Sequence, residues 1–278
     1  ISGRPFESFY FGYKLKKKNP NINWIPDYRD QWNTYQDTQS KNLLTKLFSI
    51  IEKKIEKKWT SNSSFFITTT PDWKNRISKF INKKGIVIMN GYEGEIINNN
   101  NDSSKNSKLN ILYTGTLYQN QPIEKFISVV SKINSKMGNS IDLQFIGCDM
   151  ITGQNKRLEK IKEHHNGNLN IIDRISKDKL HKYLMEADLF FLTGFDNVKG
   201  WYPVKLFEYS KYSKPIILFP NENSIIKDFL LKTNTGFIFN ETNELEKKLT
   251  DLIRLKKENK KIEINKNIFE LKKFSRKH

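Results

Sequence analysis

The sequence predicts an α/β protein of two domains, each built on a parallel β-sheet that helices cover. The chain has 278 residues, which is enough for two domains with separate cores. Short apolar runs alternate along it with amphipathic helical patterns. The tract NNNNDSSKNSK at Asn98–Lys108 has no apolar side chain to bury, so we expect it to be a linker between the domains.

The first part, residues 1–97, has the weaker alternation. Strand patterns occur at Asn23–Pro26, Phe65–Thr68 and Ile86–Met89, and helical patterns at Asn42–Lys58 and Pro71–Asn82. The first residues read like the middle of a protein, so we expect this domain to be incomplete and the chain to be a fragment.

The second part, residues 109–262, alternates more regularly. We expect strands at Leu109–Thr114, Ile141–Ile146, Leu169–Ile172, Leu189–Leu192, Ile216–Phe219 and Gly236–Phe239. Between and after them we expect helices at Ile123–Met137, Asn155–His165, Lys177–Glu186, Pro203–Tyr212, Ser224–Leu231 and Asn243–Glu258. Strands that are apolar along their whole length are typical of a parallel sheet covered on both faces.

Ligands of such sheets bind beyond the carboxyl ends of the strands, which directs attention to the loop Thr193–Tyr202 and the helix after it. A helix N-terminus at this edge favours a phosphate group. Lys205 in the first turn is unfavourable for the helix dipole, and a bound diphosphate would explain it. Glu208 lies on the same face and could accept hydrogen bonds from sugar hydroxyls. The alternative is that Lys205 and Glu208 form an ordinary surface salt bridge.

Four segments together resemble one family. GWYPVKLFEYSKYSKP at Gly200–Pro215 resembles the donor loop and helix of family-four retaining glycosyltransferases of the GT-B fold. ILYTGTL (111–117) and LQFIGCD (143–149) resemble the first two strands of their second domain, and IIDRISKDKLHKYLMEADLFFL (171–192) resembles the segment around the nucleobase. The resemblance implies two Rossmann-like domains facing a cleft, with residues 263–278 returning towards the first domain.

The resemblance also implies the donor-binding residues. Glu208 would bind the ribose hydroxyls of a nucleotide-diphosphate sugar, and the backbone around Tyr202, Val204 and Lys205 would meet the diphosphate or the hexose. The turn Gly115–Thr116 would approach the distal phosphate, Arg174 and Ile175 would border the base, and Trp201 could act as a lid. Enzymes of this kind need no metal, and the nucleotide sugar is a substrate, so no cofactor is expected.

The departures from the family pattern weaken this assignment. The family often has a first glutamate at the donor hexose, where this chain has Gly200. The usual arginine after the glycine-rich turn is replaced by Thr116, and no lysine follows at Gln119–Gln121. Lys205 and Arg174 are then the candidates to neutralise the diphosphate.

In the first domain, WIPDYRDQW (24–32) resembles a loop at the strand end where other family members have a catalytic histidine. Asp30 could orient the acceptor hydroxyl and Arg29 could hold an anion. The alternative for the two residues is a helix cap and a buried ion pair.

The composition limits the classes of binding partner that we expect. The net charge of +18 suggests nucleic-acid binding. Against this, the lysines are spread over the whole chain, arginine is scarce, and no nucleic-acid-binding motif occurs in the sequence. A basic face against an anionic membrane, for example on the Lys-rich helix Asn42–Lys58, remains open. Cys148 is the only cysteine, which indicates a reducing cytoplasm.

The sequence therefore predicts a glycosyltransferase that moves a sugar to a saccharide or lipid-linked acceptor. Two alternatives remain open: a sugar-nucleotide epimerase of the same fold, and a degenerate adaptor for membranes or nucleic acid.

Overall fold

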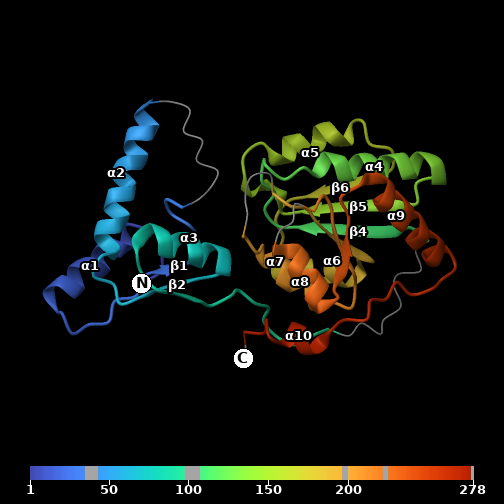
Figure 1. Cartoon of the computed structure of the whole chain (residues 1–278). Helices are drawn as coiled ribbons and strands as arrows, with labels where there is room; N and C mark the ends of the chain where they lie inside the picture. Colours follow the sequence, from blue (N-terminus) through green and yellow to red (C-terminus); the bar gives the residue numbers. More distant parts are fainter. Residues whose placement is uncertain (35–42, 98–106, 196–199, 222–224, 277–278) are drawn as a thin grey trace. The chain divides into compact units, whose positions relative to one another are not determined.

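A computed structural model describes residues 1–34, 43–97, 107–195, 200–221 and 225–276. The described residues form two compact units (Figure 1), the first from residues 1–90 with 200–202 and the second from residues 91–195 with 203–276. Residues 91–97, predicted as the end of the first domain, thus group with the second unit. Tyr92 pairs there with Ser275, and Ile97 with Tyr212.

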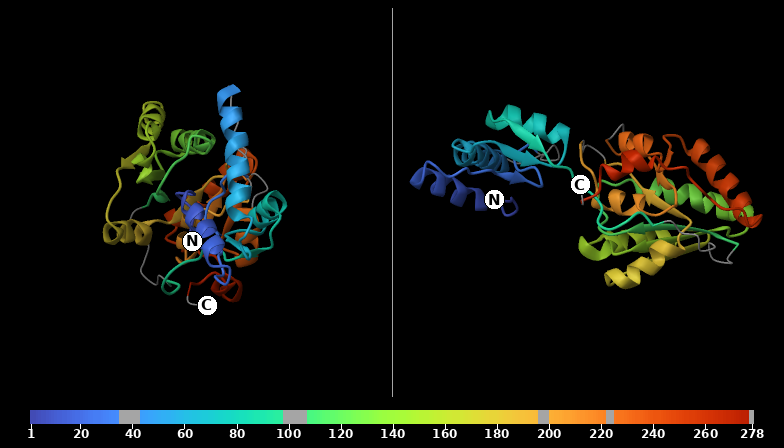
Figure 2. Two further views of the ribbon diagram at one scale, coloured as in Figure 1. Left: turned by 90° about the vertical axis from the view of Figure 1, so that its left-hand side faces the viewer. Right: turned by 90° about the horizontal axis from the view of Figure 1, so that it is seen from below.

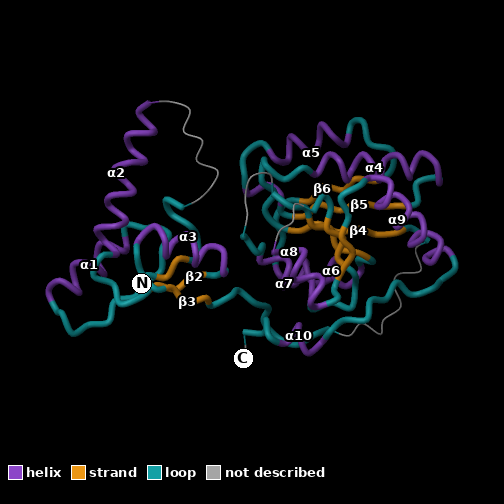
Figure 3. Tube along the Cα trace, viewed as in Figure 1, coloured by secondary structure: helices purple, strands orange, loops and turns teal. Residues whose placement is uncertain are grey.

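The second unit is built on a six-stranded parallel sheet in the order β6-β5-β4-β7-β8-β9. Its strands, orange in Figure 3, are β4 (Leu109–Thr114), β5 (Ile141–Ile146), β6 (Asn168–Ile172), β7 (Leu189–Leu192), β8 (Ile216–Leu218) and β9 (Gly236–Ile238). Each begins within one residue of its predicted start, because short runs rich in large apolar residues mark the strands.

Helices cover both faces of this sheet (Figures 1 and 2). On one face lie α4 (Ile123–Met137), α5 (Gln154–Lys162) and α9 (Thr242–Lys257), and on the other α6 (Lys177–Glu186), α7 (Val204–Ser210) and α8 (Ile225–Thr233). A short helix, α10 (Ile268–Lys272), contacts α8. On the first face Phe126 of α4 stacks on Phe191 of β7 at 3.8 Å between ring centroids. On the other face Phe190 stacks on Tyr209 of α7 at 4.4 Å. Adjacent residues of β7 therefore pack on opposite faces, as the pleat requires.

The first unit has a three-stranded parallel sheet of β1 (Asp27–Tyr28), β2 (Phe66–Thr68) and β3 (Gly85–Val87). Its helices are α1 (Ser8–Lys18), α2 (Leu43–Thr60) and α3 (Pro71–Ile81). Helix α1 was not predicted from the sequence, and the first strand was expected at Asn23–Pro26. Trp24 and Tyr28 instead belong to one aromatic cluster with Phe9 and Phe66, and pairing with β2 begins at Asp27.

No helix among the described residues is both long enough and apolar enough to span a bilayer. The predicted linker falls largely on residues 98–106, which lie outside the described residues, as do residues 196–199 of the predicted donor loop.

Candidate functional site

The carboxyl ends of β4, β5 and β6 lie side by side in the second unit. The register pairs Thr114 with Ile146 and Ile146 with Ile172. The pairing continues one residue further, where Gly115 N–H donates to the Ile146 carbonyl at 2.7 Å and Gly147 N–H to the Ile172 carbonyl at 2.8 Å. The turns that follow the three strands are therefore neighbours, and they contain predicted site residues.

Gly147 brings two of these turns close together. A Cβ at this position would lie 3.7 Å from the Cα of Gly115 and 3.8 Å from the Cα of Arg174, and its φ of +74° disfavours other residues. Arg174 is held by its own N–H, which donates to Asp149 Oδ1 at 3.1 Å. The structure thus brings together Gly115 and Arg174, which sequence reasoning connected only through resemblance.

Helix α7 supplies the cation at this edge. Lys205 Nζ donates to the Thr116 carbonyl at 3.1 Å and lies 3.7 Å from the centroid of the Tyr113 ring. Burial lowers the pKa of Lys205 to about 7. Cys148 lies at the same turn, with its Sγ 3.7 Å from the Gly115 carbonyl. Burial raises its pKa to about 12, so the thiol stays protonated and is a poor nucleophile.

Tyr209 fixes α7 against the end of β4. Its hydroxyl accepts from Thr114 N–H at 2.7 Å and pairs with Thr114 Oγ1 at 3.0 Å. The helix begins at Val204, with Pro203 as the residue before its first turn, rather than at Pro203 as predicted. A helix of seven residues has a weak dipole. Lys205 and the turn at Thr116 would therefore attract an anion here more strongly than the predicted helix N-terminus.

Lys205 and Glu208 do not pair with each other. Glu208 Oε1 lies 3.0 Å from Lys211 Nζ, and the Glu208 side chain is 35% exposed. Lys211 is only 11% exposed and also donates to the Glu93 carbonyl at 3.0 Å. The alternative of a Lys205–Glu208 surface salt bridge is therefore wrong.

Lys211 also lies where the chain enters the second unit. Its carbonyl accepts from Ile97 N–H at 2.9 Å, and Ser213 Oγ donates to the Ile97 carbonyl at 3.1 Å. Sequence reasoning missed Lys211, although its spacing of three residues from Glu208 is the usual signal for a pair on one helix face.

Arg157 of α5 holds the loop between Gly115 and α4. Its guanidinium forms a bidentate pair with Glu124, with both distances 2.6 Å, and donates to the Tyr118 and Gln121 carbonyls at 3.2 and 2.8 Å. Hydrogen bonding to Arg157 lowers the pKa of Glu124 although burial opposes it. Only the structure shows this role, because Arg157 is 36 residues from Gln121 in sequence.

The remaining donor predictions stay predictions. Val204 is 58% exposed at the start of α7, and Ile175 is partly buried beside Arg174. Gly200–Tyr202 group with the first unit, where Trp201 packs against the aromatic cluster. Gly200 lies there against Asp72, since a Cβ would come within 2.3 Å of its carboxylate.

In the first unit, Arg29 and Asp30 are about half-exposed. Arg29 pairs with Asp27 at 3.1 Å and Asp30 with Arg4 at 3.8 Å. Asp27 is more buried than Arg29, but neither pair is fully enclosed, and no described helix begins at Asp30. The alternative of a cap and a buried pair is therefore not seen, and the catalytic roles remain untested.

Glu56 of α2 supports the chain segment that carries these residues. It is fully buried and accepts from the Tyr28 hydroxyl at 2.9 Å and from Asn33 Nδ2 at 2.7 Å. Burial raises the pKa of Glu56, and the hydrogen bonds only partly oppose the shift. Sequence reasoning missed this buried carboxylate because it lies in the Lys-rich run EKKIEKK.

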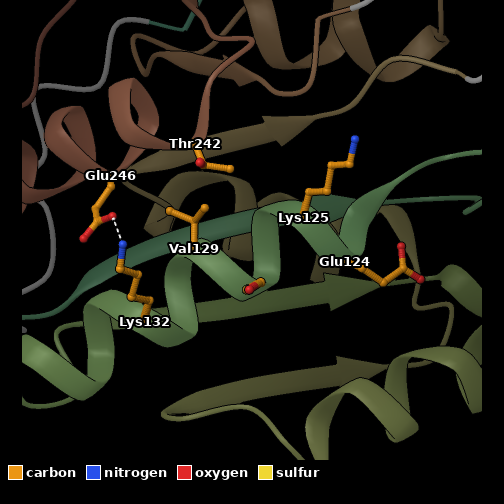
Figure 4. Close-up of a pocket in the computed structure, with 7 residues that line it drawn as sticks. Glu124, Lys125, Val129, Lys132, Thr242 and Glu246 are labelled. Carbon is orange, nitrogen blue, oxygen red and sulfur yellow. Dashed lines mark hydrogen bonds and ion pairs between the residues drawn. The ribbon is translucent and has the colours of Figure 1, made fainter.

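An open pocket of about 420 Å³ lies between α4 and α9, where Glu246 pairs with Lys132 (Figure 4). Its lining includes none of the predicted site residues. Among the described residues, no group of three His, Cys, Asp or Glu side chains is placed to hold a metal ion.

The fold and this edge of the sheet define a GT-B protein with Rossmann-like units. The chain belongs to the family Glycosyl transferases group 1, whose profile matches residues 95–268, more than half of its length. No curated protein matches the chain in sequence.

Many solved structures share the fold, and three of them serve as examples. TarM of S. aureus has a TM-score of 0.57 at 16% identity, with 89% of this chain and 49% of TarM covered. HepE of Anabaena, solved with UDP and glucose, has a TM-score of 0.61 at 12% identity, with 89% and 66% covered. The UDP-forming α,α-trehalose-phosphate synthase of Burkholderia xenovorans, solved with glucose-6-phosphate, has 0.64 at 9%, with 97% and 69% covered. The chain thus spans about half the length of TarM.

Proposed function

We propose that this protein transfers a sugar from a nucleotide-diphosphate sugar to a hydroxyl of a saccharide or lipid-linked acceptor, with retention of configuration and without a metal ion. The proposal rests above all on Lys205, whose Nζ lies 3.1 Å from the Thr116 carbonyl. Lys205 would supply a cation at the turn that the family uses for the distal phosphate. This chain lacks the usual arginine and lysine there. Membership of the glycosyltransferase family supports the reaction class.

In this proposal the second unit binds the donor. The base lies beside Arg174 and Ile175, Glu208 accepts hydrogen bonds from the ribose hydroxyls, and Lys205 meets the diphosphate near Gly115 and Thr116. Positive charge fixed where the leaving diphosphate gains negative charge stabilises the transition state more than the ground state.

The acceptor hydroxyl loses its proton to an oxygen of the donor's own phosphate. At the same time the hydroxyl oxygen attacks the anomeric carbon from the same face from which the leaving group departs. The bond to the diphosphate breaks, and the proton leaves with that group. Arg29 and Asp30 of the first unit would orient the acceptor, and Trp201, Tyr202, Val204 and the backbone at Gly200 would border the donor hexose. We further propose action in the cytoplasm, in peripheral contact with a membrane that carries the acceptor.

The test compares nucleotides that differ in one hydroxyl. We expect UDP or GDP to bind more tightly than its 2′-deoxy analogue in calorimetry, by about 1.5–3 kcal/mol for hydrogen bonds to a carboxylate. In Glu208→Ala this difference disappears, whereas Glu246→Ala, which removes a carboxylate of the α4–α9 pocket, retains it. Nucleotide binding that is unaffected in Glu208→Ala would refute the site. Loss of sugar transfer on chelation of divalent ions would refute the metal-independent mechanism.

A further inference from the structure

The N-terminal half of α2 exposes an unusual amount of apolar surface. Six residues, which we call the apolar end of α2, are each between 51% and 73% exposed: Leu43, Leu44, Leu47, Phe48, Ile50 and Ile51. At 100° per residue they fall on one broad arc of the helix. Single exposed apolar residues are ordinary, but six on one arc of one helix mark an interaction surface.

The C-terminal half of the same helix does the packing within the first unit. Glu56 and Thr60 are buried there, and Trp59 lies 5.7 Å from Trp32 and 5.5 Å from Tyr10 between ring centroids. The N-terminal half extends beyond the other elements of this unit (Figure 1). The apolar end is therefore not needed for packing among the described residues of the unit.

The charges of α2, and of the helix that packs against its C-terminal half, indicate what the apolar end binds. α2 carries five lysines, all exposed: Lys46, Lys53, Lys54, Lys57 and Lys58. Of its two carboxylates, Glu56 is buried on Tyr28 and Asn33, which leaves Glu52 as the exposed one. Helix α1, which packs against α2, adds Lys14, Lys16, Lys17 and Lys18. A second copy of the chain docked here would bring like charges together, whereas an anionic surface would match them.

We propose that the apolar end of α2 inserts into the headgroup region of a bilayer that contains anionic lipids, with the exposed lysines of α2 contacting lipid phosphates and those of α1 adding attraction at longer range. A helix with an apolar arc and a lysine-rich remainder binds at the interface of a membrane without crossing it. Each lysine near an anionic surface adds attraction that salt screens. This surface deepens the peripheral membrane contact of the proposed function and rests on that part of it, although the binding itself requires neither a donor nor an acceptor.

Vesicle flotation tests the proposal. The protein should bind vesicles with about one third phosphatidylglycerol at least about tenfold better than pure phosphatidylcholine, and less well when salt is raised. Leu47→Asp with Phe48→Asp should lower this binding at least about tenfold. The matched control, Leu231→Asp with Phe269→Asp, alters residues of the second unit that are 61% and 74% exposed, and should leave it unchanged. Equal losses in both double variants, or no preference for anionic vesicles, would overturn the proposal.

A site-specific probe gives a second readout. Cys148 is fully buried, so a cysteine introduced as Phe48→Cys can be labelled selectively with an environment-sensitive fluorophore. Anionic vesicles should shift its emission to the blue, and the same label at Phe269→Cys should not respond. A blue shift that depends on protein concentration without vesicles would show a second copy as the occupant and refute the membrane surface. Nucleotide affinity should be unchanged in Leu47→Asp, which separates this proposal from the donor site.

Discussion

Donor binding should weaken as the pH rises, because the cation at the proposed diphosphate site is half-neutral near pH 7. Burial lowers the pKa of Lys205 to about 7, whereas an ordinary lysine titrates more than three units higher. A bound diphosphate favours the ammonium and raises this pKa again. Above about pH 7, binding therefore takes up a proton, and affinity falls.

The magnitude follows from the protonated fraction. With a pKa of about 7, about nine tenths of Lys205 is charged at about pH 6 and about 3% at about pH 8.5. If only the ammonium form binds, the affinity falls about 30-fold over this range, which corresponds to about 2 kcal/mol. A nucleotide sugar is the appropriate ligand, because its diphosphate lacks the terminal ionisation that a free nucleotide shows near pH 6.

Calorimetry across this pH range, in buffers of different ionisation enthalpy, measures both the affinity and the proton uptake. Lys205→Arg should bind with little pH dependence, because arginine stays charged. Lys205→Met should bind weakly at every pH, yet the folded protein should be more stable at neutral pH. The unfolded state holds more protons than the folded state between about pH 7 and the ordinary lysine value, so the wild type loses stability as the pH falls through that window. A wild-type affinity that is flat from about pH 6 to about pH 8.5 would refute the reasoning.

Two further predictions concern buried groups that hold site residues. Lys211→Met removes the partner of Glu208, and we expect nucleotide affinity to fall about three- to tenfold because the carboxylate loses its position. In calorimetric titration, Lys211→Arg should recover most of the lost affinity. Equal losses in both variants would contradict a role of Lys211 in positioning Glu208. Glu56→Ala leaves the donors of Tyr28 and Asn33 without an acceptor, so the free energy of unfolding should drop by about 2–4 kcal/mol in urea denaturation. Because the folded pKa of Glu56 is raised, wild-type stability should decline as the pH rises above the ordinary carboxyl value, and Glu56→Gln should show a flatter profile. An unchanged pH profile in Glu56→Gln would argue against this shift.

The sequence allowed the second unit to be predicted far better than the first, for a physical reason. Strands such as Leu109–Thr114 are buried on both faces, so their apolar runs stand out whatever surrounds them. In the first unit, strand pairing covers only two or three residues, and the core is aromatic side chains from separate segments. Trp24 is buried but precedes the strand, which made the predicted strand begin too early.

The site shows the same division. Gly115, Thr116 and Lys205 could be proposed as site residues because motifs carry them, and their binding roles stay predictions. The contacts of Arg157 and Glu56 could not be predicted, because their partners are distant in sequence. Long-range hydrogen bonds leave no periodic signal along the chain. They are also what holds the motif residues in place, as the Arg157 contacts with Tyr118 and Gln121 show.

In the proposed donor site, a single lysine takes the place of the cations expected after the glycine-rich turn, because its charge reaches that turn from another element. Lys205 comes from α7 but bonds to the carbonyl of Thr116, the residue that stands where the family usually has arginine. Arginine stays charged at any physiological pH, whereas a lysine partly buried over Tyr113 does not. If the proposed site is correct, Lys205 conserves the position of the charge but makes that charge depend on pH and on the ligand. We infer that the donor itself completes the cationic site by raising the pKa of Lys205 when it binds.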